Sequence, residues 1–222
     1  MNAFLLVGSP KGRKSASYLL GSMLAEGMRK RGAAVSEGMV HEGLRSEDGT
    51  ARLLDSVDGA DLVLFAFPLY IDSLPAPFTR LLELISERRA RFAPAGSPRL
   101  AVVVQCGFPE AHQCETAVGI CRLFAERTGM RWAGALAMGM GGSVGGDPGK
   151  MPGGGKNILD ATGMASESLA NGGVIPEAAT ALFAKPLMRR WLYTMIGNLG
   201  WRMELRKNKA QKPLTYRPYS QE

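Results

Sequence analysis

Three short apolar runs constrain the fold of this chain more than any other feature of its sequence. They cover residues 3–7, 62–67 and 100–104, and each is almost free of polar side chains. Such runs are typical of strands that are buried on both faces of a parallel sheet. Apolar residues at helical spacing follow each run, and strands that alternate with amphipathic helices predict right-handed βαβ units.

Weaker signals extend this pattern to five strands, with further candidates at residues 33–40 and 132–138. Five such strands favour a doubly wound, flavodoxin-like parallel α/β sheet with helices on both faces over a closed barrel. Ligands of these sheets bind beyond the carboxyl ends of the strands. We therefore expect one rim to be shared by the loops after Val7, Phe67, Val104 and Met138.

The net charge of +7 belongs to the end of the chain. Residues 185–222 carry nine Lys and Arg against two acidic residues, whereas residues 1–184 carry eighteen of each. Apolar residues recur at helical spacing over 187–199. We expect an α/β domain over 1–184 and a basic helical C-terminal extension over 185–222. A nucleic-acid surface is disfavoured, because no recognised nucleic-acid module accompanies the charge.

Three cysteines, Cys106, Cys114 and Cys121, match neither a disulfide framework nor the CxxC spacing of metal sites. We expect a reducing cytoplasm and no bound metal. The first apolar run lacks the basic region and cleavage site of a signal peptide, and no stretch reaches the ~20 apolar residues of a spanning helix. The stripe at 187–199 leaves contact with an anionic membrane surface open, although such stripes more often pack on their own domain or a dimer partner.

The loop after the first apolar run has the composition of an anion site. It contains Gly8, Ser9 and Lys11, and a helical pattern follows at once. Backbone N–H groups at a helix start, hydroxyls and a lysine together suit a phosphate. The alternative is that Ser15 only caps the helix, which requires no ligand.

Two known phosphate motifs fit this loop poorly. Gly8, four residues and then Lys14-Ser15 nearly match a P-loop, but Arg13 stands where that motif needs its second glycine. No predicted strand ends in a Walker B aspartate, and the GxGxxG fingerprint of dinucleotide sites is missing. The phosphate monoester of a mononucleotide such as FMN fits the loop better than a triphosphate or a pyrophosphate.

The loop after residues 62–67 is unusually apolar for its place on the predicted rim. It begins with Pro68, Leu69, Tyr70 and Ile71. A flat, mostly apolar ring would explain this composition, whereas Tyr70 as an ordinary packing residue is the alternative. Residues 139–155 hold nine glycines and two prolines; this suits a backbone approach to a ligand as well as a simple linker.

Together, these motifs resemble the NAD(P)H-dependent FMN reductase family of flavodoxin-like oxidoreductases. The resemblance rests on Gly8-Ser9-Pro10-Lys11, on the spaced Ser15 and Ser17, and on Pro68-Leu69-Tyr70 before Pro75. The segment 106–110 and the glycine-rich 139–155 are similar to one clostridial-type branch. The match covers roughly residues 3–175.

The resemblance implies an FMN site made by two groups of residues. Those implied to hold the phosphate are Ser9, Lys11, Ser15, Ala16 and Ser17. Those implied to lie along the isoalloxazine, with part of 139–155, are Pro68, Leu69, Tyr70, Ile71, Gly107 and Phe108. Many members are dimers that complete the flavin site across the interface, so a homodimer is expected. The four-cysteine cluster of the related iron–sulfur flavoproteins is absent, so no such cluster is expected.

The resemblance also implies an NAD(P)H-dependent FMN oxidoreductase. FMN would pass reducing equivalents from NADH or NADPH to a small acceptor: a quinone, a nitro or azo compound, or free flavin. Because the flavin does the chemistry, no catalytic residue is assigned, and roles for Cys106 and His112 stay open. The alternative is a flavodoxin-type electron-transfer protein without substrate chemistry; such carriers tend to be acidic and short, whereas residues 1–184 are neutral.

Overall fold

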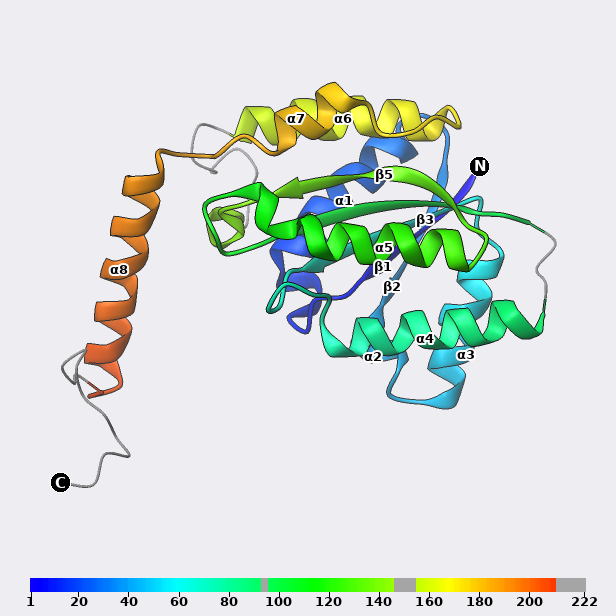
Figure 1. Cartoon of the computed structure of the whole chain (residues 1–222), viewed down its shortest axis with the longest axis horizontal. Helices are drawn as coiled ribbons and strands as arrows, with labels where there is room; N and C mark the ends of the chain where they lie inside the picture. The colour runs from blue at the N-terminus through cyan, green and yellow to red at the C-terminus, as the bar shows by residue number, and fades with distance from the viewer. Residues whose placement is uncertain (93–95, 146–154, 211–222) are drawn as a thin grey trace. The chain divides into compact units, whose positions relative to one another are not determined.

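A computed structural model describes residues 1–92, 96–145 and 155–210, and these contain one five-stranded parallel sheet (Figure 1). Its strand order is β2-β1-β3-β4-β5, which confirms the predicted doubly wound, flavodoxin-like sheet. The strands are β1 (Asn2–Val7), β2 (Ala34–Met39), β3 (Leu62–Pro68), β4 (Arg99–Gln105) and β5 (Arg131–Met138).

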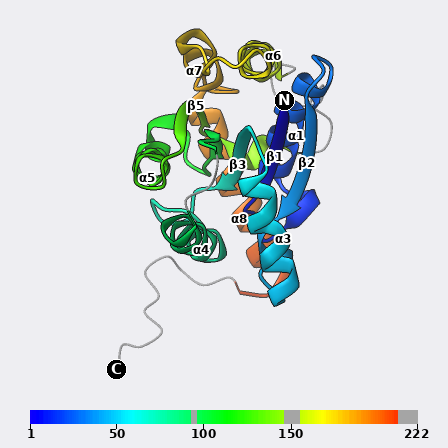
Figure 2. The same cartoon turned by 90° about the vertical axis from the view of Figure 1, so that its right-hand side faces the viewer.

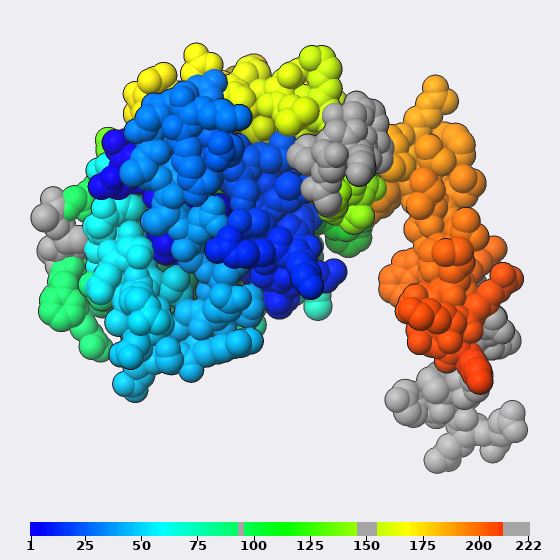
Figure 3. Space-filling view, turned by 180° about the vertical axis from the view of Figure 1, so that it is seen from behind, coloured from blue at the N-terminus to red at the C-terminus, as the bar shows by residue number. Residues whose placement is uncertain are grey.

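Helices cover both faces of this sheet (Figures 1 and 2). One face carries α1 (Ala16–Arg29), α6 (Lys156–Ala170) and α7 (Glu177–Phe183), and α1 and α6 lie side by side there (Figure 3). The other face carries α3 (Glu47–Asp58), α4 (Ala76–Arg91) and α5 (Glu115–Arg127), with the short α2 (Val40–Gly43) packed against α3 and α4.

The strands feed two separate cores, one on each face of the sheet. Leu62, Leu64 and Ala66 belong to the core under α1, whereas Val63 and Phe65 belong to the core under α4 and α5. Side chains alternate between faces along a strand, so a strand covered on both sides must be apolar at every position. This is why β3 reads as an unbroken apolar run.

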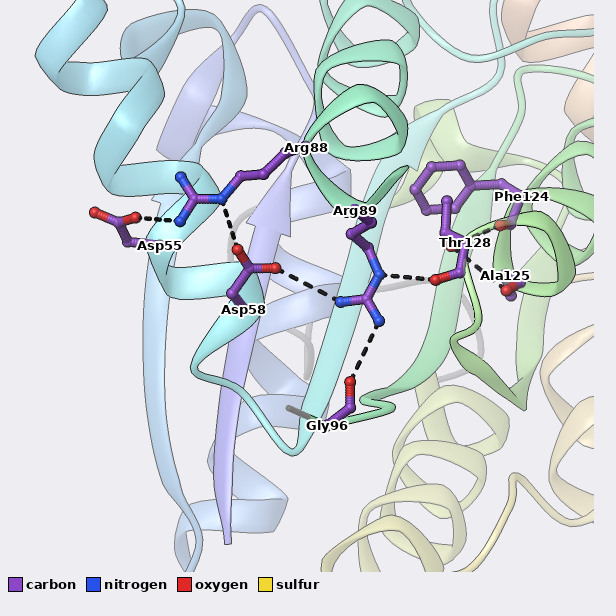
Figure 4. Close-up of polar contacts among 8 residues, drawn as sticks. All are labelled: Asp55, Asp58, Arg88, Arg89, Gly96, Phe124, Ala125 and Thr128. Atoms are coloured by element: carbon purple, nitrogen blue, oxygen red, sulfur yellow. Dashed lines mark hydrogen bonds and ion pairs between the residues drawn. The ribbon is translucent and has the colours of Figure 1, made fainter. Parts of the chain in front are cut away.

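Two arginines at the end of α4 tie three helices together (Figure 4). Arg88 donates to Asp58 and to Asp55 of α3, both at 2.7 Å. Arg89, whose side chain is only 5% exposed, lies 3.5 Å from Asp58 and donates to the carbonyl of Thr128 at 2.8 Å. Burial lowers the pKa of Arg89, and the charge of Asp58 opposes this shift. The network lies where these helices end, at the edge of the sheet opposite the strands' carboxyl ends.

The chain divides into two compact units, Met1–Leu187 and Met188–Glu222. The second unit contains α8 (Arg190–Lys207), which buries none of its own residues. This helix begins three residues later than the apolar stripe, because Arg189 has an extended backbone and serves as the N-cap. Residues 211–222, the end of the basic extension, lie outside the described part. Among the described residues, no helix has the length and apolar content needed to cross a bilayer.

Candidate functional site

The loop after β1 folds into a compact turn held by its own backbone. The N–H of Gly8 donates to the carbonyl of Ala66 in the neighbouring strand at 2.9 Å. The N–H of Gly12 then donates to the Ser9 carbonyl at 3.0 Å, and Gly12 takes a φ of 54°, a conformation that favours glycine. This turn brings Ser9 to the start of α1.

Ser15 is the N-cap of α1. Its hydroxyl accepts from the Tyr18 N–H at 3.0 Å and donates to the Gly12 carbonyl at 2.7 Å. The N–H groups of Ala16 and Ser17 lie in the first helical turn, where an α-helix offers no carbonyl partner. The Ser17 hydroxyl is buried and has no hydrogen-bond partner among the described residues. The helix start therefore combines free donors with the positive end of the helix dipole.

The loop after β3 is a tight turn with unusual backbone angles. Tyr70 and Ser73 exchange hydrogen bonds of 2.9 and 3.2 Å between their main chains. Between them, Ile71 and Asp72 take φ values of 47° and 61°. A β-branched residue with positive φ is rare and strained. The turn leaves Ile71 98% exposed and Tyr70 46% exposed.

The loops after β4 and β5 are joined through their main chains. The Cys106 N–H donates to the Met138 carbonyl at 3.1 Å, and the Gly141 N–H donates to the Cys106 carbonyl at 2.7 Å. The Met140 N–H donates to the Phe108 carbonyl at 2.6 Å. A Cβ atom on Gly141 would overlap the side-chain amide of Gln105, so this close approach requires glycine.

These four loops line one cavity of about 310 Å³ at the carboxyl ends of the strands. The rim predicted from the strand pattern is therefore confirmed. Eight of the predicted site residues line the cavity: Ser9, Lys11, Ser15, Ala16, Pro68, Leu69, Tyr70 and Gly107. A larger groove runs along α8, but its walls come only from that exposed helix and the two arginines at its start.

Three predicted residues are not among those that line the cavity: Ser17, Ile71 and Phe108. Ser17 is buried in the first turn of α1, Ile71 is held outward by its turn, and Phe108 is half exposed. His112 is exposed and is also absent from the lining. Residues 146–154 of the glycine-rich segment lie outside the described part of the chain.

Three further lining residues, Lys14, Gln105 and Cys106, were not predicted to bind the cofactor. The others, Gly141, Gly142 and Val144, lie in the glycine-rich 139–155, part of which was expected at the site. Gln105 is the last residue of β4, so its position at the strand end could have predicted that it lines the cavity. The described part of the chain holds no group of His, Cys, Asp and Glu side chains suited to a metal ion.

Known proteins share this fold and, in part, this sequence. A family model described as NADPH-dependent FMN reductase matches residues 1–118. The structure is similar to an NADH:FMN oxidoreductase in its apo form, with 15% identity, a TM-score of 0.60, and coverage of 81% of this chain and 93% of that one. No curated protein sequence matches the chain.

Two further solved structures extend the likeness. An FMN-dependent NADH-azoreductase from Bacillus anthracis, in complex with FMN, is 10% identical with a TM-score of 0.56, covering 77% of this chain and 98% of that one. A WrbA-like flavodoxin from Agrobacterium tumefaciens is 18% identical with a TM-score of 0.52, covering 77% and 95%. At these identities the likeness establishes the fold alone.

Proposed function

The chain belongs to the NADPH-dependent FMN reductase family, and on that premise we propose that it binds FMN in the cavity at its strand ends. FMN would carry reducing equivalents from NADH or NADPH to a small acceptor: a quinone, a nitro or azo compound, or free flavin. The observation that carries this proposal is the placement of free donors and two lysines in a cavity whose walls also include the apolar Pro68 and Leu69 and the backbone of Gly107.

The start of α1 is suited to the phosphate. The N–H groups of the first turn need acceptors, and phosphate oxygens would supply them, whereas the hydroxyl of Ser17 is buried behind the lining. Lys11 and Lys14 line the same end of the cavity and would balance the phosphate charge. The Ser15 hydroxyl donates its one proton to the Gly12 carbonyl and accepts from the Tyr18 N–H, so we propose that it positions the first turn and does not donate to the phosphate.

The wall formed by the loop after β3 is suited to a flat ring. Pro68 ends β3, and Leu69 and Tyr70 follow it at the rim. Gly107 leaves open space where a Cβ atom would stand, so a ring can approach its backbone closely. Pockets of this size and mixed character are typical of cofactor sites.

FMN, when bound, supplies hydride acceptance and two-electron transfer. The residues of the chain would bind it, orient it and limit access to one side. Among the described lining residues there is neither a carboxylate nor a histidine. We therefore propose no protein acid or base for this reaction.

Steady-state turnover tests this proposal. The FMN-loaded protein is expected to oxidise NADH or NADPH continuously in the presence of a quinone. A protein that binds FMN but turns over neither nucleotide would be an electron carrier without substrate chemistry, and the reductase proposal would be wrong. A homodimer and a cytoplasmic location stay predictions; light scattering of the purified chain tests the first.

A further inference from the structure

Two cysteine side chains meet at the wall of the candidate FMN cavity. Cys106 directly follows β4, and Cys114 directly precedes α5. Both are buried, their side chains interact, and Cys106 lines the cavity. They also share an acceptor: the Met138 carbonyl lies 3.1 Å from the Cys106 nitrogen and 3.9 Å from the Cys114 sulfur.

The Cys106 sulfur lies inside the loop that separates the two residues. It is 3.8 Å from the Phe108 carbonyl and 3.6 Å from the Glu110 carbonyl. The interaction with Cys114 lowers the pKa of Cys106, against the opposing effects of burial and of the Glu110 charge, and it raises the pKa of Cys114. A lowered pKa increases the thiolate fraction of Cys106, and the thiolate is the nucleophile.

The third cysteine lies outside the loop of residues 106–114. Cys121 lies seven residues further along, within α5, and is fully buried in the core under α4 and α5. Burial alone raises its pKa to about 12. Cys121 therefore serves as an internal control when the oxidation of Cys106 and Cys114 is measured.

We propose that Cys106 and Cys114 are a redox-active dithiol that hydroperoxides convert into a disulfide beside the cavity. The Cys106 thiolate attacks the peroxide, so that an S–O bond forms, the O–O bond breaks and, for hydrogen peroxide, water leaves after taking up a proton. The Cys114 thiol then attacks the resulting sulfenic sulfur and displaces a second water, which takes the Cys114 proton. Two thiols are oxidised, and one peroxide is reduced to two waters.

The disulfide would close the loop of residues 106–114. That loop contains Gly107, which lines the cavity, and Phe108, whose carbonyl accepts from Met140. Forming the bond removes the thiol proton that Cys106 donates to the carbonyls of Phe108 and Glu110. Oxidation would therefore change one wall of the cavity, whether or not FMN occupies it.

Cysteine mapping tests this inference on the full chain as purified. The reduced protein is treated with hydrogen peroxide, denatured in N-ethylmaleimide, digested and analysed by mass spectrometry. We expect a cross-linked Cys106–Cys114 peptide with the label on Cys121 alone, and recovery of all three labels after reduction. Full labelling of Cys106 and Cys114 after peroxide, or cross-links that involve Cys121 instead, would overturn the inference. This readout needs no flavin and is separate from the proposed reductase activity.

Two variants sharpen the test. Cys121→Ser should form the same cross-link at the same rate as the unchanged chain. Cys114→Ser lacks the second thiol, so Cys106 should proceed to sulfinic acid and lose its label irreversibly. A Cys106 thiol in Cys114→Ser that stays fully labelled would contradict the assignment of Cys106 as the attacking group. If a variant does not fold, the mapping of the unchanged chain still decides the matter.

Discussion

The backbone of Gly8 lies directly against the aromatic ring of Phe78. A Cβ atom at Gly8 would overlap that ring and would lie 3.1 Å from the Cβ of Phe67. Phe78 is fully buried and packs edge-on against Phe65, with ring centroids 4.8 Å apart. Because the ring is confined, the core under α4 fixes where the candidate phosphate loop begins.

Substitution of Gly8 should therefore disturb both stability and the site. We expect Gly8→Ala to lower the free energy of unfolding by about 1–3 kcal/mol, the usual cost of overpacking, and to weaken FMN binding by displacing Ser9. Denaturant unfolding and flavin titration measure the two effects.

Gly163 is the matched control for this substitution. It lies within α6 with nothing near its would-be Cβ atom. Gly163→Ala should stabilise the protein by up to about 1 kcal/mol, since alanine is the better helix former. If Gly8→Ala unfolds at the same denaturant concentration as the unchanged chain, the steric account of Gly8 is wrong.

Two arginines of α4, the buried Arg89 and the exposed Arg80, should contribute unequally to the stability of the protein. Arg89→Ala is expected to lower the free energy of unfolding by about 1–3 kcal/mol, because it leaves the carbonyls of Thr128 and Gly96 without their donor, while Asp58 keeps Arg88 as a partner. Arg80 on the same helix forms an exposed pair with Glu83, so Arg80→Ala should leave the unfolding midpoint almost unchanged. Equal unfolding midpoints for the two variants would contradict this difference.

Oxidation of Cys106 should depend on pH near neutrality. The interaction with Cys114 lowers the pKa of Cys106 below that of an ordinary thiol, so its thiolate is lost only at a correspondingly lower pH. The rate of disulfide formation should level off at a lower pH than for an ordinary thiol and fall about tenfold per pH unit well below the pKa of Cys106. Quenched maleimide labelling at fixed peroxide measures it. A rate that still rises steeply from pH 8 to pH 9 would indicate an unshifted thiol.

If the chain consists of two units, the second, Met188–Glu222, can be deleted without unfolding the first. Its helix α8 buries none of its residues. Deletion of residues 188–222 should leave the unfolding midpoint of the remaining chain and its FMN affinity unchanged. Circular dichroism and flavin titration check this. A truncated chain that does not fold would show that the extension is part of the α/β domain.

The sequence predicted most clearly the strands whose apolar residues follow from burial alone. β3 and β4 are covered on both faces, so their apolar runs were unambiguous. β2 pairs only with β1 and alternates between exposed and half-buried positions, which is why its signal was weak. Arg189, with its extended backbone, delays the start of α8 in a way that apolar spacing does not reveal.

The site was predictable at the level of loops but not of every residue. We could predict that the four loops lie together, because the carboxyl ends of parallel strands share one edge of the sheet. The outward turn at Ile71 depends on two positive φ values, and a β-branched residue such as Ile71 disfavours such a value. The place of Gly141 in the cavity wall depends on its close approach to Gln105, a residue distant in sequence.

The central claim is that the start of α1 holds the phosphate of FMN, and comparison of FMN with riboflavin tests it most directly. Riboflavin has the same ring but no phosphate. Titration of the flavin-free protein, followed by flavin fluorescence, should give a dissociation constant at least about tenfold lower for FMN, as expected when charge-assisted hydrogen bonds are lost with the phosphate.

Two lysine variants complete this measurement. Lys11→Gln should lose most of the preference for FMN, because Lys11 lines the cavity. Lys30→Gln, at the exposed far end of α1, should keep it. Equal affinities for FMN and riboflavin in the unchanged chain, or no binding of either, would contradict the account.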